Sequence, residues 1–331
     1  RALLAALLAM LLAAVLAWAA WSRYQAFLAE PLAIPPAGLV FDLAPGSNGA
    51  NIVERLSASG LTRADWQWKL LMRLEPRVYR AGEYRIEAGT RPRDLLELLA
   101  SGRVIQYRLT LVEGWAFRQL AEALAADSVL AHRFDLLDPS QWPLLAAELG
   151  VEHPEGWFLP ETYQFVRGDS DLDLLRRAHR AMREALAEAW ASRSPDSPLE
   201  SPYQLLVLAS IIEKETAVEE ERGQIAGVFA RRLQKGMRLQ TDPTVIYGLG
   251  ETFDGDIRRR DLEADTPYNT YTRHGLPPTP IAMPGRASLQ AAARPADGEA
   301  LYFVADGSGG HTFSTTLAEH QAAVKRLLER Q

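Results

Sequence analysis

A run of twenty apolar residues at the start of the sequence, Ala2 to Trp21, most constrains what this chain can fold into. At about 1.5 Å per helical residue, such a run spans roughly 30 Å, the thickness of the hydrocarbon layer of a bilayer. It has no polar face, and Trp18 and Tyr24 lie where interfacial aromatic side chains are expected. The sequence therefore predicts an uncleaved single-pass anchor over residues 1–24, with a cleavable signal peptide as the alternative.

The rest of the chain has the composition of globular domains. Its 331 residues fit two or three domains, and 24% charged residues exclude global disorder. A net charge of -6 argues against a general nucleic-acid binder, which needs a basic face. The absence of cysteine excludes disulfides, Cys-based zinc sites and thiol catalysis. The six histidines show no metal-binding spacing, so we expect neither a metal nor another cofactor.

Three prolines between Pro31 and Gly38 indicate a stiff linker over residues 25–38. Short alternating strands, glycine turns and amphipathic helices follow, and residues 39–87 fit a βααβ unit. Such a unit is typical of a small glycan-binding module. The alternative is a generic α+β spacer that separates the later residues from the membrane.

A buried helix that ends in two glutamates is the main candidate for chemistry. Leu205 to Ile212 is apolar on every face except at Ser210, which predicts a buried helix with Glu213 in its last turn. Desolvation and the negative end of the helix dipole both oppose ionisation there, as a general acid requires. Glu215 lies about 200° round the helix, so the two carboxyl groups should not share one cleft wall. The alternative is that both are solvated cap or ion-pair residues.

Several segments after this helix have recognisable patterns. Thr216 and Glu219 match a capping box, which predicts a second helix from near Ala217 to Gly236. The polar and aromatic residues that follow it suit sugars, because rings stack on pyranose faces and amides bind hydroxyls. The remaining expectations are a helix over residues 171–191, a hairpin of residues 300–306 and 311–315, and a final helix over residues 317–329. In that hairpin, His311 is expected to be structural or to face substrate.

Several long motifs in fixed order give the sequence a specific resemblance. It resembles the endolytic murein transglycosylases of the YceG-like (MltG) family over nearly its whole length. The motifs that carry the resemblance are Val112–Gly114, Glu155–Tyr163, Leu208–Thr216, Arg238–Gly248, Tyr268–Tyr271, Gly275–Pro278, Tyr302–Asp306 and Gly310–Phe313.

The resemblance implies an α+β protein with an N-terminal transmembrane helix, a small LysM-like subdomain over residues 39–108 and a larger catalytic domain over residues 109–331. It implies a lyase of the inner (plasma) membrane whose extracytoplasmic (periplasmic) domain cuts peptidoglycan glycan strands internally. The MurNAc-β-1,4-GlcNAc bond would be cleaved without water, leaving a 1,6-anhydro ring. One glutamate would act first as acid and then as base, and it maps to Glu213. The residues expected to bind substrate are Glu215, Gln240, Asp242, Tyr247, Tyr268, Asn269 and Tyr271.

Two other functions remain open on the sequence alone. A hydrolytic muramidase would leave reducing ends, and a non-catalytic cell-wall tether would need only the anchor and the LysM-like part. Besides peptidoglycan and the membrane, the resemblance implies cell-wall synthases (penicillin-binding proteins) as partners.

Overall fold

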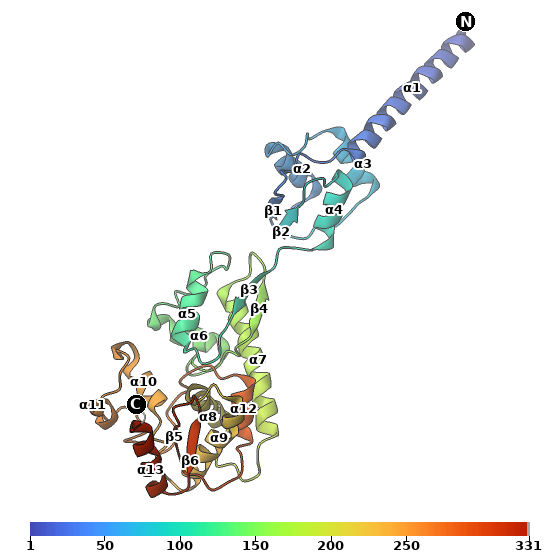
Figure 1. The fold of residues 1–331 in the computed structure, drawn as a ribbon. Coiled ribbons are helices and arrows are strands. Elements are labelled where there is room, and N and C mark those ends of the chain that lie inside the picture. The colour runs from blue at the N-terminus through green and yellow to red at the C-terminus, as the bar shows by residue number, and fades with distance from the viewer. Residues whose placement is uncertain (330–331) are drawn as a thin grey trace. The chain divides into compact units, whose positions relative to one another are not determined.

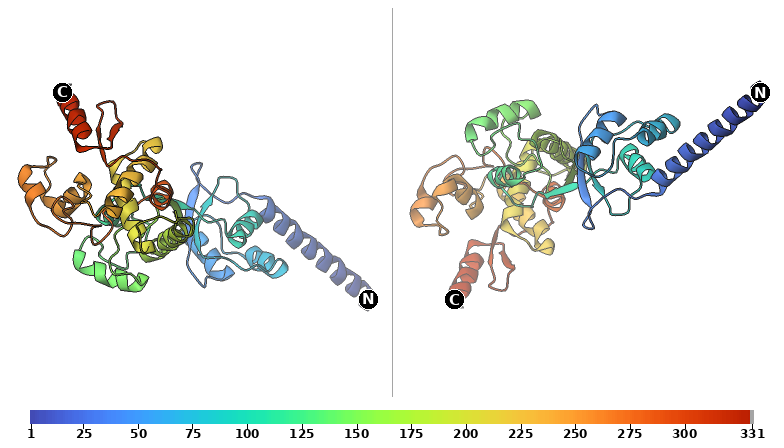
Figure 2. Two further views of the ribbon diagram at one scale, coloured as in Figure 1. Left: turned by 90° about the horizontal axis from the view of Figure 1, so that it is seen from below. Right: turned by 90° about the horizontal axis from the view of Figure 1, so that it is seen from above.

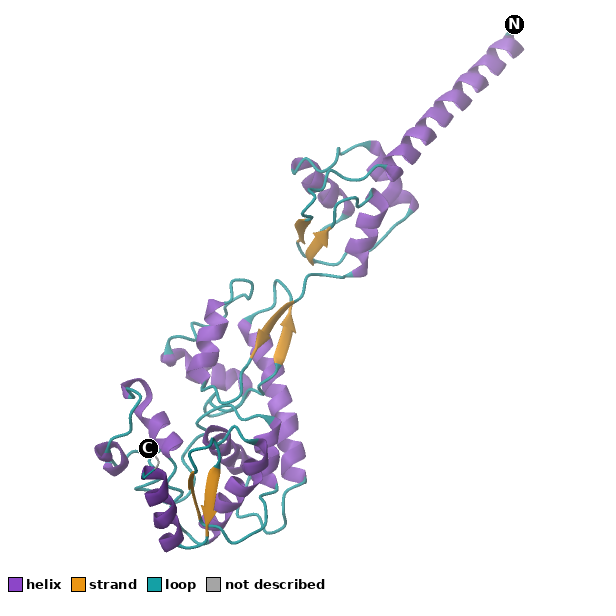
Figure 3. Ribbon diagram, viewed as in Figure 1, coloured by secondary structure: helices purple, strands orange, loops and turns teal. Residues whose placement is uncertain are grey.

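The computed structural model describes residues 1–329, which form two units (Figure 1). The first consists of Arg1–Tyr107 and Phe165–Gly168, and the second of Arg108–Gln164 and the residues from Asp169 onward. Helices dominate both, and the strands occur as three two-stranded pairs (Figure 3). The α+β class predicted from the sequence is confirmed.

The first unit begins with the apolar helix α1 (Ala2–Ala29), which is long and apolar enough to span a membrane. It continues with β1 (Leu39–Leu43), α2 (Gly49–Ala58), α3 (Trp66–Leu74), β2 (Gly82–Ile86) and α4 (Pro92–Ser101). Strands β1 and β2 pair antiparallel with Phe41 opposite Tyr84, so residues 39–86 form a β–α–α–β unit. Trp68, Tyr84 and Leu95 are fully buried in its core.

The C-terminal end of α1 belongs to this core. Tyr24 is 2% exposed, whereas the preceding residues of α1 are exposed. Residues 25–38, which we expected as a linker, are helical to Ala29 and contribute Leu32 and Ile34 to the same hydrophobic cluster. The Leu32 N–H also donates to the carbonyl oxygen of Thr90 (2.9 Å). The proline-containing segment is therefore packed against the core of the first unit and is not a free linker.

The second unit is built around α8 (Pro202–Glu215), which packs against α7 (Asp171–Ala191), α9 (Glu219–Gln234) and α12 (Arg286–Ala293), and also against α10 (Asp242–Leu249). The elements before α7 are β3 (Tyr107–Thr110), α5 (Phe117–Ala126), a 3-10 turn (Pro139–Gln141), α6 (Trp142–Leu149) and β4 (Thr162–Phe165), and β3 pairs with β4. Between α9 and α12 lie α10, a second 3-10 turn (Gly250–Thr252) and α11 (Arg259–Glu263). The helix predicted over residues 171–191 is confirmed.

The chain closes with β5 (Tyr302–Ala305), β6 (His311–Ser314) and α13 (Leu317–Leu328). Strands β5 and β6 form an antiparallel hairpin with Phe303 opposite Phe313, and α13 packs on it (Figure 2). The predicted hairpin and final helix are confirmed. Phe303 meets Phe229 of α9 edge to face at 5.7 Å, which attaches the hairpin to the helical core.

The packing of the α1 end predicts how far the chain can be shortened. A fragment that begins at Ser22 keeps Tyr24, Leu32 and Ile34, whereas one that begins at Pro35 lacks all three. Losing a large buried side chain costs about 2–5 kcal/mol, so the Pro35 fragment should unfold at a markedly lower temperature in its first unit. The full chain should sediment with membranes even in high salt, and the Ser22 fragment should stay in solution. Equal melting of the two fragments would show that these residues contribute nothing to the core.

Candidate active site

The helix that carries the two candidate glutamates is positioned by its apolar residues. Ser201 caps the N-terminus of α8, and the eight residues from Leu205 to Ile212 are all buried. Ser210 is the polar exception predicted from the sequence. Its hydroxyl donates to the Val207 carbonyl oxygen (2.7 Å) and accepts the N–H of Ile281 (3.0 Å), so its burial leaves no polar group unpaired. The helix is thereby fixed, and its last turn is presented at a defined place.

The chain leaves α8 in a way that differs from the prediction. Thr216 is extended and caps the C-terminus of α8, and its hydroxyl accepts the N–H of Val218 (2.9 Å). Helix α9 begins at Glu219 without a side-chain cap, so the predicted capping box between Thr216 and Glu219 is wrong. The threonine hydroxyl binds the backbone of the connecting turn instead.

Glu215, the last residue of α8, has a desolvated carboxyl group. Its Oε1 accepts a short hydrogen bond from the hydroxyl of Thr241. Burial raises the pKa of Glu215 to about 7; the Thr241 hydrogen bond opposes this rise, and the negative charge of Asp242 adds to it. This carboxyl group therefore holds a proton at pH values where an ordinary glutamate has lost it.

Glu213 has a different environment on the same turn. Like Glu215, it is half-buried and not enclosed as predicted from the sequence, and its Oε2 accepts the N–H of Gly285 (2.9 Å). Glu113 lies close by, and burial together with the charge of Glu213 raises the pKa of Glu113. The neighbouring Lys214 points to another partner, with its Nζ donating to the Gly114 carbonyl oxygen (3.2 Å).

Two cavities meet at the end of α8. The larger, of about 520 Å³, is lined by fifteen residues that include Glu215, Gln240, Thr241, Asp242, Tyr271, Tyr302 and His311. The smaller, of about 420 Å³, is lined by Glu113, Gly114, Glu213, Lys214, Glu215, Thr216, Ala217 and Arg222. Glu215 borders both. The expectation that Glu213 and Glu215 share no cleft wall is wrong, because both residues line the smaller cavity at the end of the helix.

Three of the expected substrate-binding residues line the larger cavity with Glu215. The Tyr271 hydroxyl donates to Asp242 Oδ1 (2.6 Å), and Asp242 is the first residue of α10. Gln240 has φ of 54°, a left-handed conformation that is uncommon outside glycine. Its N–H donates to the Thr270 carbonyl oxygen (3.2 Å), which fixes this conformation. Such backbone strain is typical of functional sites.

The other three expected residues, Tyr247, Tyr268 and Asn269, do not line either cavity. Asn269 is buried, and its Nδ2 donates to three carbonyl oxygens at the end of α11, while its Oδ1 accepts the N–H of Tyr271. The rings of Tyr247 and Tyr268 meet at 4.9 Å, and the Tyr268 hydroxyl pairs with Thr279. These residues hold the loop that places Tyr271.

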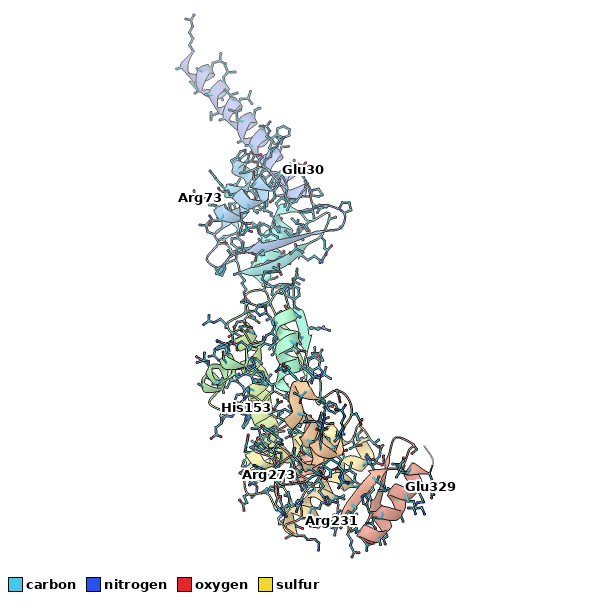
Figure 4. The ribbon with its side chains drawn as sticks, turned by 90° about the vertical axis from the view of Figure 1, so that its left-hand side faces the viewer. Glu30, Arg73, His153, Arg231, Arg273 and Glu329 are labelled. Atoms are coloured by element: carbon cyan, nitrogen blue, oxygen red, sulfur yellow. The ribbon has the colours of Figure 1, made fainter. Side chains whose placement is uncertain are left out.

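A buried arginine in the wall of the larger cavity was not predicted from the sequence. Arg232 of α9 is 7% exposed, and its Nε and Nη1 donate to the carbonyl oxygens of Leu301 (2.6 Å) and Leu239 (2.8 Å). Its guanidinium group also lies over the ring of Tyr302, 5.0 Å from the centroid. Arg232 thus connects α9 to the segments that precede α10 and β5. An arginine among the apolar positions of α9 was the available signal. Its neighbour Arg231, labelled in Figure 4, donates to the carbonyl oxygens of Ala296 and Ala300 instead.

A third carboxyl group with a raised pKa lies in the core of this unit. Glu155 is 2% exposed; both its oxygens accept the N–H of Phe117, and Oε2 also accepts the hydroxyl of Tyr247 (3.0 Å). Its own N–H donates to Nδ1 of His153, which is labelled in Figure 4. Burial raises the pKa of Glu155 to about 7 against the effect of these hydrogen bonds. Through Tyr247, Glu155 fixes the helix that carries Asp242.

Residues 1–329 contain no cluster of three or more His, Cys, Asp or Glu side chains that fits a metal ion.

Comparison with known proteins defines the class. The YceG-like family model matches residues 41–326, so the chain belongs to the YceG-like family. It is 34% identical over 266 residues to a protein of Bacillus subtilis named endolytic murein transglycosylase, covering 76% of this chain and 73% of that protein. A protein of the same name from Streptococcus pneumoniae is 28% identical over 300 residues, covering 81% of this chain and 54% of its own length. The crystal structure of a yceG-like protein from Listeria monocytogenes matches with a TM-score of 0.54 and 28% identity, covering 86% of this chain and 98% of that one.

The raised pKa of Glu155 predicts a specific dependence of stability on pH. Below about pH 4.5 the carboxyl group is protonated both folded and unfolded, and above about pH 7 it must ionise in the core. The free energy of unfolding should therefore fall as pH rises from about 4.5 to 7, by up to about 3 kcal/mol. Glu155→Gln should reduce this fall, measured as the change in Tm between pH 5 and pH 8. The exposed Glu152→Gln is the matched control, and equal pH dependence in all three proteins would contradict the assignment.

Proposed function

We propose that this protein is a membrane-anchored lytic transglycosylase that cleaves the glycan strands of peptidoglycan internally. Membership of the YceG-like family and the names of the curated relatives support the reaction class. The observation that carries the proposal is the desolvated carboxyl group of Glu215 on the wall of a polar and aromatic cavity. The bond cleaved is the β-1,4 linkage from N-acetylmuramic acid to N-acetylglucosamine.

Glu215 suits the role of proton donor better than Glu213, which the sequence favoured. A general acid needs a carboxyl group that is protonated near the working pH, and the pKa of Glu215 is about 7. Glu215 borders both cavities, whereas Glu213 borders the smaller one and is bound to the Gly285 N–H. Glu215 can therefore reach a bond held between the two cavities.

One carboxyl group is sufficient for the proposed reaction. Glu215 gives its proton to the leaving glycosidic oxygen as the bond from C1 to that oxygen breaks. The 6-hydroxyl of the same muramyl residue attacks C1, and its proton passes to the Glu215 carboxylate. The bond from O6 to C1 closes the 1,6-anhydro ring, Glu215 ends protonated, and no water is consumed.

The runner-up reaction is hydrolysis by two carboxyl groups. Asp242 lines the same cavity, and its charge raises the pKa of Glu215. It could therefore supply the second carboxylate that hydrolysis requires. Asp242, however, accepts the hydroxyl of Tyr271 at 2.6 Å. This hydrogen bond favours a role for Asp242 in shaping the cavity.

The two cavities also support an internal cut. An enzyme that cleaves within a strand must hold sugars on both sides of the scissile bond, and a cavity lies on each side of the Glu215 carboxyl group. The strand would then pass over the end of α8, with Tyr271 offering its ring to a sugar face.

The remaining parts of the proposal concern location. Helix α1 would anchor the chain in the inner (plasma) membrane with residues 109–331 as the extracytoplasmic catalytic domain. The β–α–α–β unit would act as a LysM-like glycan-binding subdomain within residues 39–108 and increase the local concentration of substrate. Cell-wall synthases remain predicted partners.

The assignment of Glu215 is tested by two isosteric variants. Glu215→Gln removes the transferable proton and should lower kcat on purified glycan strands by about 10²–10⁴-fold or more. Glu213→Gln is the matched control on the same helical turn and should keep most of the activity. Activity of the wild type should also fall as pH rises through about 7, because the acid loses its proton. A well-folded Glu215→Gln with normal activity beside an inactive Glu213→Gln would return the role to Glu213.

A further inference from the structure

One side-chain pair, of which His311 lines the larger cavity, has no part in the reaction described so far. Glu221, in the first turn of α9, binds His311 at the start of β6 twice. The His311 N–H donates to Oε1 (2.8 Å), and Nδ1 lies 2.7 Å from Oε2. Both side chains are 15% exposed. The carboxylate accepts one hydrogen bond from the backbone and pairs with the ring, which fixes the rotation of the imidazole.

Two neighbours reinforce this arrangement. A Cβ at Gly310 would lie 2.7 Å from Glu221 Oε1, so a residue without a side chain is needed for the carboxylate to approach the strand. The ring of Phe303 meets the imidazole edge to face at 5.4 Å, with the planes at 84°. The histidine is therefore held by a carboxylate on one side and an aromatic ring on another.

The carboxylate also determines which nitrogen of His311 carries the proton. An ionised glutamate only accepts hydrogen bonds, so Nδ1 must donate, and in the neutral ring the lone pair is then on Nε2. Within residues 1–329, Nε2 has no hydrogen-bond partner, and His311 lines the larger cavity together with Glu215. The pair thus offers a fixed acceptor to a ligand in that cavity.

We propose that Glu221 and His311 form a hydroxyl-binding dyad beside Glu215. His311 Nε2 accepts a hydrogen bond from a hydroxyl group of the sugar held next to Glu215, and Glu221 is the positioning residue that fixes the tautomer. The proposal rests on the proposed function for the identity of the sugar. It adds a second polar contact that orients the substrate while Glu215 transfers the proton.

Kinetics on purified glycan strands test the role in the reaction. His311→Asn keeps a donor near the Nδ1 position and removes Nε2. Glu221→Gln removes the carboxylate that fixes which ring nitrogen carries the proton. Each should lower kcat/KM by about tenfold or more, while His311→Gln, whose amide reaches the Nε2 position, should recover part of the loss. Glu220→Gln, an exposed neighbour on α9, is the matched control and should behave as wild type.

Nuclear magnetic resonance of the full chain in detergent, labelled with ¹⁵N-histidine, tests the geometry without relying on activity. The His311 signals should show a protonated Nδ1 and an unprotonated Nε2, and adding chitotetraose should shift Nε2. In Glu221→Gln, the signals should no longer show the proton confined to Nδ1 of His311. A protonated Nε2 in the neutral wild-type ring, or an Nε2 signal that does not shift when chitotetraose is added, would overturn the dyad. If wild type cleaves strands and both variants match it, the dyad alone is wrong; if wild type cleaves none, the proposed function is wrong and the resonance results still judge the dyad.

Discussion

The desolvation of one carboxyl group, that of Glu215, is the constraint on which the rest of the site depends. An ionised carboxylate away from water is costly, so the group keeps its proton to about pH 7 and accepts the hydroxyl of Thr241. That environment exists because α8 is apolar from Leu205 to Ile212 and lies in the middle of the helical core. The buried helix therefore sets both the place and the protonation state of the group that we propose as the acid.

The walls around this group are held by polar contacts that cross between distant segments. Arg232 joins α9 to Leu239 before α10 and to Leu301 before the hairpin, and Asn269 holds the loop that places Tyr271. Glu155 reaches α10 through Tyr247. These three buried side chains are paired with backbone or with another side chain, which favours one arrangement of the cavity over alternatives.

The sequence predicted the parts of the fold that depend on local pattern. The α+β class, the helix Asp171–Ala191 and the hairpin with its following helix follow from periodicity and turn residues. The role of Thr216 was wrong because a capping motif fits the start of one helix and the end of another equally well. The packing of Tyr24 against the first unit was missed because a long apolar run gives no sign of where it stops facing lipid.

Residues of the site were harder to predict because their roles depend on contacts far apart in the sequence. Tyr268 and Asn269 have the side chains of a sugar site, yet they hold the loop, and only the neighbouring Tyr271 reaches the cavity. The choice between Glu213 and Glu215 depends on the burial of the Glu215 carboxyl group among segments distant in the sequence, such as Thr241, 26 residues later, which no helical wheel contains. The partner of His311 is 90 residues away, so neither histidine spacing nor charge pattern could reveal it.

Isotope labelling of the product tests the central claim most directly. Purified glycan strands would be digested by the full chain in water enriched with ¹⁸O, and the new ends would be analysed by mass spectrometry. Intramolecular attack by the 6-hydroxyl predicts muramyl ends that have the mass of the 1,6-anhydro form and contain no ¹⁸O. New reducing ends that carry one ¹⁸O each would contradict the account and identify the enzyme as a hydrolase.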